Sequence, residues 1–292
     1  MNNFLLGYAN IVDNSILTAS NSWQSTLPLS NIKTRELSRK ARSVNEDAFT
    51  LTFDFSSSGD VPIGCLALAE HNFSRDCVIA IKGYKGGVLV YSSNETYAWP
   101  YLDPTDVFFD TYDYTPAIIS NYLIAKERKN FIFIFDENKR IDKIEIEIND
   151  TSNENGFIDI GRAFIGSLYQ PTRNANFGDI SIGISDNTEI QYSRTKSKFF
   201  NELAKQRTVS IVWGNLSKEE GIQLLKIQNT HGISGELLFA NGYPTVIEIS
   251  DKDAFSSIWT ATSFLSTASE LTALSFPNLH LYSGGFRLEE VL

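Results

Sequence analysis

Apolar and polar residues alternate along much of the chain. Segment 48–55 reads "AFTLTFDF", with an apolar residue at every odd position, and segment 144–148 alternates Ile with Glu. A period of two is typical of a strand with one buried and one solvated face. We therefore predict strands in both segments. The short runs "CLALAEHNFS", "CVIAIKGY" and "GGVLVYSS" are further predicted strands, and the Gly pair before the last one predicts a hairpin.

The segment "NFIFIFDENKRIDKIEIEIND" has the pattern of a hairpin. Asn130 to Phe135 is apolar, residues 136–140 are polar, and the Ile–Glu alternation follows them. Two strand patterns joined by a short polar connection usually pair with each other. The sequence therefore predicts that these two strands are neighbours in one sheet.

Helical features are confined to "NLSKEEGIQLLKIQNTHG". Ser217 and Glu220 have the spacing of a capping box, in which each side chain accepts a hydrogen bond from the other's backbone N–H. Gly232 stands where a helix often ends in a left-handed conformation. We predict one helix, over residues 218–230.

The run "NDTSNENGFIDIGRAFIG", residues 149–166, contains a polar turn, a short strand and a second apolar run. We interpret it as the closing edge of one β-sandwich and the start of the connection to a second unit. The text that follows, "SLYQPTRNANFG", has no strand alternation and carries Pro, Asn and Gly, which favour loops. The sequence therefore predicts a mainly β protein with a sandwich over residues 1–170 and a second β domain over residues 171–292. A chain of 292 residues is long enough for both.

Composition narrows the class of protein. The net charge is −10 and the pI is about 4.9, so no basic stripe suited to nucleic acid dominates. The best local candidate for binding nucleic acid is the run 194–198, "RTKSK", which we interpret as a solvated loop.

No stretch approaches the ~20 apolar residues that span a bilayer, and the N-terminus lacks the basic start of a signal peptide. Cys65 and Cys77 lie in apolar text, so we expect two buried free thiols in a protein made in a reducing cytoplasm.

The first half resembles galactose-binding-like (discoidin-type) β-sandwich domains. Its last strands, "IEIEINDTSNENGFIDIGRAFIG", resemble the end of that fold, and "LTASNSWQSTLPLSNIKTRELSRKARS" resembles its entry, with Pro28, Asn31, Arg39 and Arg42 at the matching positions. Many members have Trp where this chain has Ala41. The resemblance implies a jelly-roll-like sandwich.

The second half extends the resemblance to bacteriophage tail virion proteins. Arg207 with "VSIVWGNLSKEEG", "HGISGELLFANGYP" and the terminus "GGFRLEEVL" are similar to the domain that often follows such a sandwich. The resemblance implies a non-enzymatic structural component of the tail or tail tip. Such a component is made in the host cytoplasm and located in the virion. It would form an oligomeric ring or adaptor with copies of itself and with other tail proteins. The alternative is a module that binds carbohydrate or a host receptor.

The chemistry of the sequence offers no reactive centre. His71, His231 and His280 are far apart, and no GxSxG or phosphate-binding glycine motif is present. The acidic residues of the segment 97–119 have two interpretations, a calcium site or an ordinary acidic surface loop. A third and weaker interpretation is a pair of catalytic carboxylates, as in a glycosidase. We therefore expect no catalytic residue, no metal site and no cofactor.

Aromatic residues interleaved with Asp give the best candidate for sugar binding. A sugar site usually offers a flat ring for stacking and polar groups for hydroxyls. The same rings could instead pack the segment down or form a subunit interface, where Tyr and Trp are enriched. The candidate residues are Trp99, Tyr101, Asp103, Tyr112 and Tyr114, with Trp23 near the N-terminus.

Overall fold

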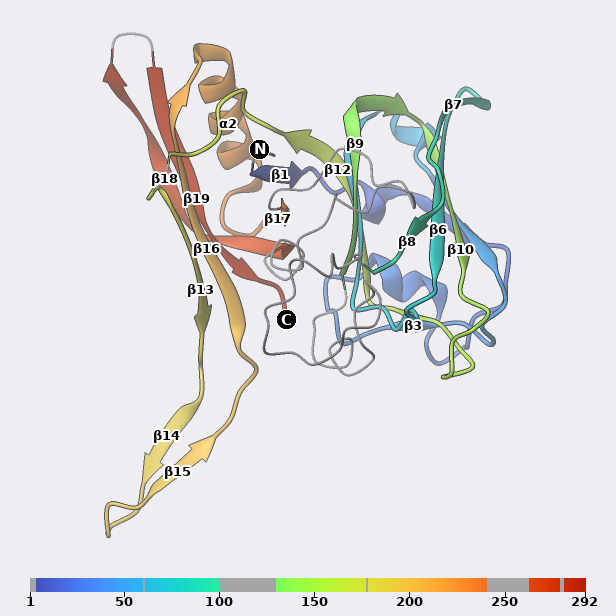
Figure 1. Ribbon diagram of the computed structural model, residues 1–292, viewed down its shortest axis with the longest axis horizontal. Coiled ribbons are helices and arrows are strands. Elements are labelled where there is room, and N and C mark those ends of the chain that lie inside the picture. The colour runs from blue at the N-terminus through green and yellow to red at the C-terminus, as the bar shows by residue number, and fades with distance from the viewer. Residues whose placement is uncertain (1–3, 60, 100–129, 177, 241–262, 279–280) are drawn as a thin grey trace, which may run out of the picture.

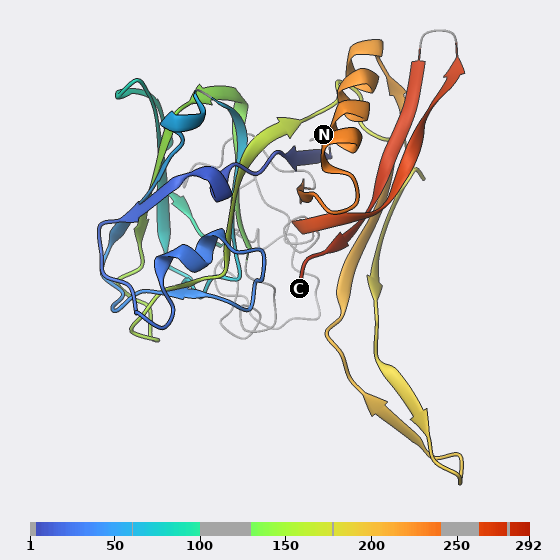
Figure 2. The same ribbon diagram turned by 180° about the vertical axis from the view of Figure 1, so that it is seen from behind.

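The computed structural model describes residues 4–59, 61–99, 130–176, 178–240, 263–278 and 281–292. It is mainly β, with two bodies and a projecting hairpin (Figures 1 and 2). The strands of the first body are β1 (Leu5–Tyr8), β2 (Ile16–Ala19), β3 (Ala41–Arg42), β4 (Phe49–Asp54), β5 (Val61–Ala69), β6 (Val78–Lys85), β7 (Val88–Ser92), β8 (Thr96–Tyr97), β9 (Asn130–Ile141), β10 (Lys143–Asn149), β11 (Asp159–Ile160) and β12 (Arg162–Tyr169). Short 3₁₀ turns occupy Val12–Asn14, Leu29–Lys33 and Ser56–Ser58.

The remaining elements follow residue 170. They are β13 (Ile180–Ser185), β14 (Glu189–Tyr192), β15 (Lys198–Asn201), β16 (Gln206–Leu216), α2 (Lys218–His231), β17 (Glu236–Ala240), β18 (Phe264–Asn278) and β19 (Leu281–Glu290).

Two sheets face each other in the first body. One contains β2-β4-β10-β6-β7, with β8 also on β6, and the other contains β12, β5 and β9. The predicted alternation is confirmed, because β4 and β10 each bury every second residue. The Gly pair also forms the predicted hairpin, since Gly86 and Gly87 both have positive φ and connect β6 to β7.

The hairpin predicted for residues 130–149 is wrong. β9 pairs with β5, whereas β10 lies between β4 and β6 in the opposite sheet. The polar residues 136–140 do not form the connection but continue β9, opposite Pro62 and Ile63. The chain changes sheets at Asp142, so both apolar faces point into one core instead of lying side by side.

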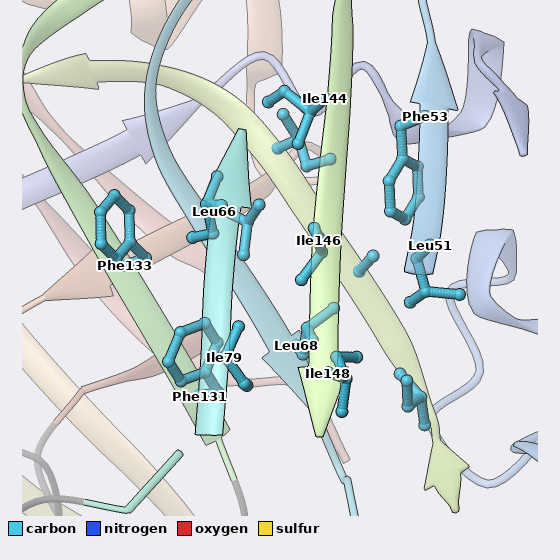
Figure 3. Packing of buried hydrophobic residues seen from close by; sticks show 14 of the residues in the cluster. Leu51, Phe53, Leu66, Leu68, Ile79, Phe131, Phe133, Ile144, Ile146 and Ile148 are labelled. Carbon is cyan, nitrogen blue, oxygen red and sulfur yellow. The ribbon is translucent and has the colours of Figure 1, made fainter. Parts of the chain in front are cut away.

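That core lies between the two sheets (Figure 3). Phe53 from β4 and Ile146 from β10 face Leu66 from β5 and Phe133 from β9, and all four are almost fully buried. Burying one such side chain stabilises a fold by about 1.5–3 kcal/mol. The apolar faces of the two sheets are therefore buried against each other within one chain.

The second body is a curved sheet with one helix packed on it (Figure 1). The predicted capping box is confirmed, because Ser217 and Glu220 accept hydrogen bonds from each other's backbone N–H. The helix ends at Gly232, whose φ is 54°. Leu224 and Ile227 face the sheet and pack with Trp213 and its neighbours.

A nine-stranded sheet, β13-β16-β19-β18-β17-β1-β12-β5-β9, runs through both bodies. β1 makes the connection, since Leu6 is opposite Phe239 of β17 on one side and Tyr169 of β12 on the other. The predicted boundary at residue 170 falls directly after β12. The segment 149–166 ends in β12, which follows β5 and β9 as the last strand of that sandwich sheet. It is not a free edge, because β1 joins it to β17 in the second body and all eight residues of β12 are buried.

Candidate functional site

A buried ion network connects the two bodies. Arg162, fully buried at the start of β12, donates two hydrogen bonds to Glu236 of β17, at 3.0 and 2.7 Å, and one to Asp13 at 2.6 Å. Asn10 donates to the same Glu236 carboxylate. Burial acts to lower the pKa of Arg162, and the bonds to Glu236 and Asp13 outweigh it and raise the pKa. The guanidinium therefore stays charged and holds β12 to the second body.

A second ion pair joins two C-terminal segments, "RTVSIVW" in β16 and "FRLEEVL" in β19. Arg207, in β16, donates to Glu290 at the end of β19, and the backbone N–H of Arg207 donates to the same carboxylate at 3.0 Å. Glu290 is buried. The "RTVSIVW" and "FRLEEVL" segments are thus neighbouring strands, which fixes the base of the projecting hairpin.

That hairpin consists of β14 and β15, and residues 186–205 that contain it are called the arm. The arm extends beyond the curved sheet, away from α2 (Figures 1 and 2). β14 and β15 pair only with each other among the described strands. An isolated two-stranded hairpin is marginally stable in water, so the arm gains little from its own contacts.

One face of the arm is mostly apolar, although Lys198 also lies on it, opposite Tyr192. Ile190 is opposite Phe200 in the ladder, and Tyr192 lies two residues further along the same face. Tyr192 is 64% exposed and Phe200 59%. On β13, Ile182 and Ile184 continue the apolar exposure toward the sheet. The five apolar residues are called the apolar stripe.

The tip of the arm is basic. Arg194, Lys196 and Lys198 lie at or beside the turn between β14 and β15, and all three are exposed. The prediction of a solvated position for the run 194–198 is confirmed, but the run is the turn of a structured hairpin and not an irregular loop. The alternation in "EIQY" before the run, and the two Phe residues in "KFFN" after it, are the features of the sequence that indicate these strands.

A surface hollow of about 280 Å³ lies over the outer face of the sandwich. Its lining is Ser20, Ala48, Phe49, Thr50, Val78, Ala80, Glu95, Glu147, Ile148 and Asn149. Glu147 is paired with Lys82 at 2.5 Å. The hollow therefore combines a floor of small side chains with carboxylate, amide and hydroxyl groups that could bind a polar ligand.

The structure describes two of the six predicted sugar-binding residues, Trp99 and Trp23. Trp99 is buried, and its indole N–H donates to the carbonyl of Phe73 at 3.0 Å. Trp23 is half-buried and contacts the edge of Phe49, which also lines the hollow. The other four candidates, Tyr101, Asp103, Tyr112 and Tyr114, lie outside the described residues.

The described residues contain no cluster with the composition of a metal site. No group of three His, Cys, Asp or Glu side chains there could hold a metal ion. His71 accepts a hydrogen bond from the backbone N–H of Phe73 and stacks on that ring. Cys65 and Cys77 are buried free thiols, as predicted, and burial raises the pKa of both. No helix in the described part of the chain is long and apolar enough to cross a membrane.

Among known proteins, the chain is similar only to solved structures, and only in fold. No protein-family model matches the chain, and no curated protein matches it. A family 32 carbohydrate-binding module of Clostridium perfringens NanJ, in complex with galactose, is 11% identical, with 55% of this chain and 98% of that chain covered and a TM-score of 0.36. The C. perfringens module CpGH89CBM32-4 is 22% identical, with 55% and 100% covered and a TM-score of 0.35. A chitosan-binding module from Paenibacillus sp. IK-5 is 10% identical, with 55% and 99% covered and a TM-score of 0.36. The description of the sandwich accordingly rests on its own strand pairings.

Proposed function

We propose that this chain is a non-enzymatic structural protein that assembles with copies of itself through the arm. The supporting observation is the apolar stripe, whose side chains are exposed on β13 and on the β14–β15 hairpin. Among the described strands, none lies beside that hairpin. Exposed apolar patches of this kind mark protein interaction sites. The ion pairs of Arg162 and Arg207 hold the arm's base and the sandwich in a fixed arrangement, as an adaptor requires.

The finer proposal is a component of a bacteriophage tail or tail tip, located in the virion, that forms a ring or adaptor with other tail proteins. This assignment draws on the resemblance of the C-terminal motifs, and the ring draws on the arm. Peptides of the chain in density-purified phage particles, identified by mass spectrometry, would support it. Their absence from particles whose other tail proteins are detected would exclude it.

Self-assembly has a direct test in the substitution Phe200→Lys. We expect wild-type protein to gain mass with concentration in sedimentation equilibrium, and Phe200→Lys to remain monomeric. Val44→Lys is the matched control, because Val44 is 56% exposed but lies on the sandwich, far from the arm in sequence and fold. A wild-type protein that is monomeric at every concentration would refute the proposal.

Glycan binding by the sandwich is the second candidate, and the hollow over β4, β6 and β10 favours it. Several similar structures are described as carbohydrate-binding modules or as complexes with galactose or Lewis b antigen. A glycan array is the test. Binding lost in Glu147→Gln but kept in Glu145→Gln, which lies two residues away on the same strand, would locate it in the hollow. Trp99→Ala is unsuitable because Trp99 is buried.

A further inference from the structure

β13 is the last strand of the nine-stranded sheet and leads directly into the arm (Figure 1). Among the described strands it pairs with β16 alone, so its other edge has no neighbour there. Proteins usually protect such an edge with charged residues, Pro or a covering element, but "ISIGIS" contains neither a charge nor a Pro. Ile182 is 45% exposed and Ile184 70%. The strand is therefore suited to pair with a strand from outside the molecule.

The free edge of β13 presents the backbone groups of alternate residues. The backbone N–H of Val212 donates to the carbonyl of Asp179 at 3.0 Å, so that carbonyl points toward β16. Because the direction of the backbone groups alternates along an antiparallel ladder, residues 181, 183 and 185 also point toward β16. The N–H and C=O groups of Ile182 and Ile184 thus point away from it and could bond to another strand.

The sequence of β13 allows it to pair with a second copy of itself. Its middle reads "SIGIS" in both directions. In an antiparallel pair centred on Gly183, Ile182 of one copy lies opposite Ile184 of the other, and Ser181 lies opposite Ser185. Side chains directly opposite each other share a face of the sheet and pack together. The two exposed Ile residues of each copy therefore cover those of the other.

The acidic residues that flank β13 do not oppose each other in this register. Asp186 of one copy lies opposite Ile180 of the other. Asp179 lies opposite Asn187. Like charges directly opposite one another destabilise a pair of strands, and this register contains no such pair.

Gly183 lies at the centre of the register. Its φ is not positive, and among the described residues an added Cβ would have one neighbour within 4 Å, the Thr208 hydroxyl at 3.3 Å. Its backbone groups point toward β16, so Gly183 of two copies would form a non-hydrogen-bonded pair, in which the Cα atoms are about 4.5 Å apart. Glycine within a strand often marks the close approach of another backbone. The centre of the palindrome is thus also the position where the two backbones come closest.

We propose that two copies pair antiparallel through β13, with a two-fold axis at Gly183 that joins their sheets into one. This inference rests on the proposed self-assembly and specifies its geometry. Stable interfaces bury about 1,200–2,000 Å², which is more than a pair of six-residue strands provides, so the contact also uses the arm. The arm begins directly after β13, beside the start of the other copy's β13. A two-fold contact closes at two copies, so a ring or adaptor would be built from dimers.

Single cysteines test the register. The native thiols are buried, so introduced cysteines are the ones that react under mild oxidation. Gly183→Cys is expected to form a disulfide-linked dimer, because Cα atoms about 4.5 Å apart are within disulfide range. Ser181→Cys alone and Ser185→Cys alone are not, since each lies about 14 Å from its own equivalent at ~3.4 Å per residue. A mixture of these two variants is expected to form a covalent heterodimer.

The outcomes separate this inference from the proposed function. Wild type that assembles, with equal dimer yields from Gly183→Cys and Ser181→Cys, would overturn the two-fold contact and leave self-assembly standing. A mixture of Ser181→Cys and Ser185→Cys that does not crosslink would do the same, and it tests the register even if Gly183→Cys perturbs the strand. If wild type is monomeric at every concentration, both proposals fail. Far-UV circular dichroism and urea titration show that each variant is folded.

Sedimentation equilibrium gives an independent readout. Ile184→Lys places two lysines at diagonal positions across the axis, where they repel each other, so we expect this variant to be monomeric. Ile233→Lys is the matched control, because Ile233 is 63% exposed after α2, and it is expected to assemble like wild type. Assembly of Ile184→Lys at wild-type concentrations would contradict the proposed pairing.

Discussion

Phe53 and Phe200 are the same residue type in two strands with opposite surroundings. Phe53 is fully buried between the sheets of the sandwich, whereas Phe200 is 59% exposed on the arm. The sandwich covers its apolar faces with its own chain, and the arm leaves one face uncovered. The sandwich thus buries its apolar faces within one molecule, and our proposal is that another copy covers the exposed face of the arm.

The largest contrast is expected between Phe53→Ala and Phe200→Ala. The first leaves a cavity in the core and should lower the free energy of unfolding by about 3–5 kcal/mol. The second should change it by no more than ~0.5 kcal/mol in dilute protein. Urea titration at low concentration measures both. A comparable loss in the two variants would show that the arm is part of the folded core.

Arg162→Met tests the connection between the bodies. It leaves the Glu236 carboxylate buried without its cation, so we expect a loss of about 3–5 kcal/mol in the free energy of unfolding. The double variant Arg162→Met with Glu236→Met should recover part of that loss, because no charge is then buried unpaired. A double variant no more stable than Arg162→Met would argue that packing, and not the unpaired charge, determines the effect.

Gly221→Ala tests how closely α2 lies on β19. An added Cβ would be 2.9 Å from both Cβ and Cγ of Tyr282. Overpacking of this kind usually costs about 1–3 kcal/mol, although Ala is otherwise the better helix residue. A gain in stability by thermal unfolding would mean that the helix can move away from the sheet at no cost.

Among the variants expected to lose stability, Glu220→Gln should have the smallest effect, and that effect should depend on pH. Burial acts to raise the pKa of Glu220, but hydrogen bonds from Thr172 and Ser217 outweigh it and lower the pKa below 4.5. The ionised form thus contributes stability above about pH 4.5 that is lost as the pH falls through the lower folded pKa. We expect Glu220→Gln to lose about 0.5 kcal/mol at pH 7, because Gln keeps the capping box but removes a negative charge near the helix N-terminus, and to show a shallower decline in acid. An unchanged acid profile would contradict this role.

Local patterns predicted the elements better than their partners. The alternation in β4, the capping box of α2 and the Gly86–Gly87 turn were readable because each depends on neighbouring residues. The pairing of β9 with β5 was not, since the same alternation suits a hairpin or two facing sheets. The Arg162–Glu236 bond joins residues 74 apart, which no local pattern specifies.

The candidate sites were limited in the same way, because local sequence does not specify which side chains the fold buries or exposes. Trp99 was selected because it is aromatic and lies near acids, but its burial depends on the fold. The sequence did not predict the arm, because only Ile190 and Tyr192 alternate beside its basic turn, while Phe199 and Phe200 are adjacent and lie on opposite faces. Exposure of those residues is a property of the folded chain.

Hydrogen–deuterium exchange at increasing protein concentration tests the central claim most directly. If the arm is completed by another molecule, amides of residues 189–201 should exchange quickly in dilute protein and become protected as concentration rises. Amides of β4 and β10 should be equally protected throughout. Arm amides that are strongly protected at the lowest concentration, or that stay unprotected at the highest, would contradict the account.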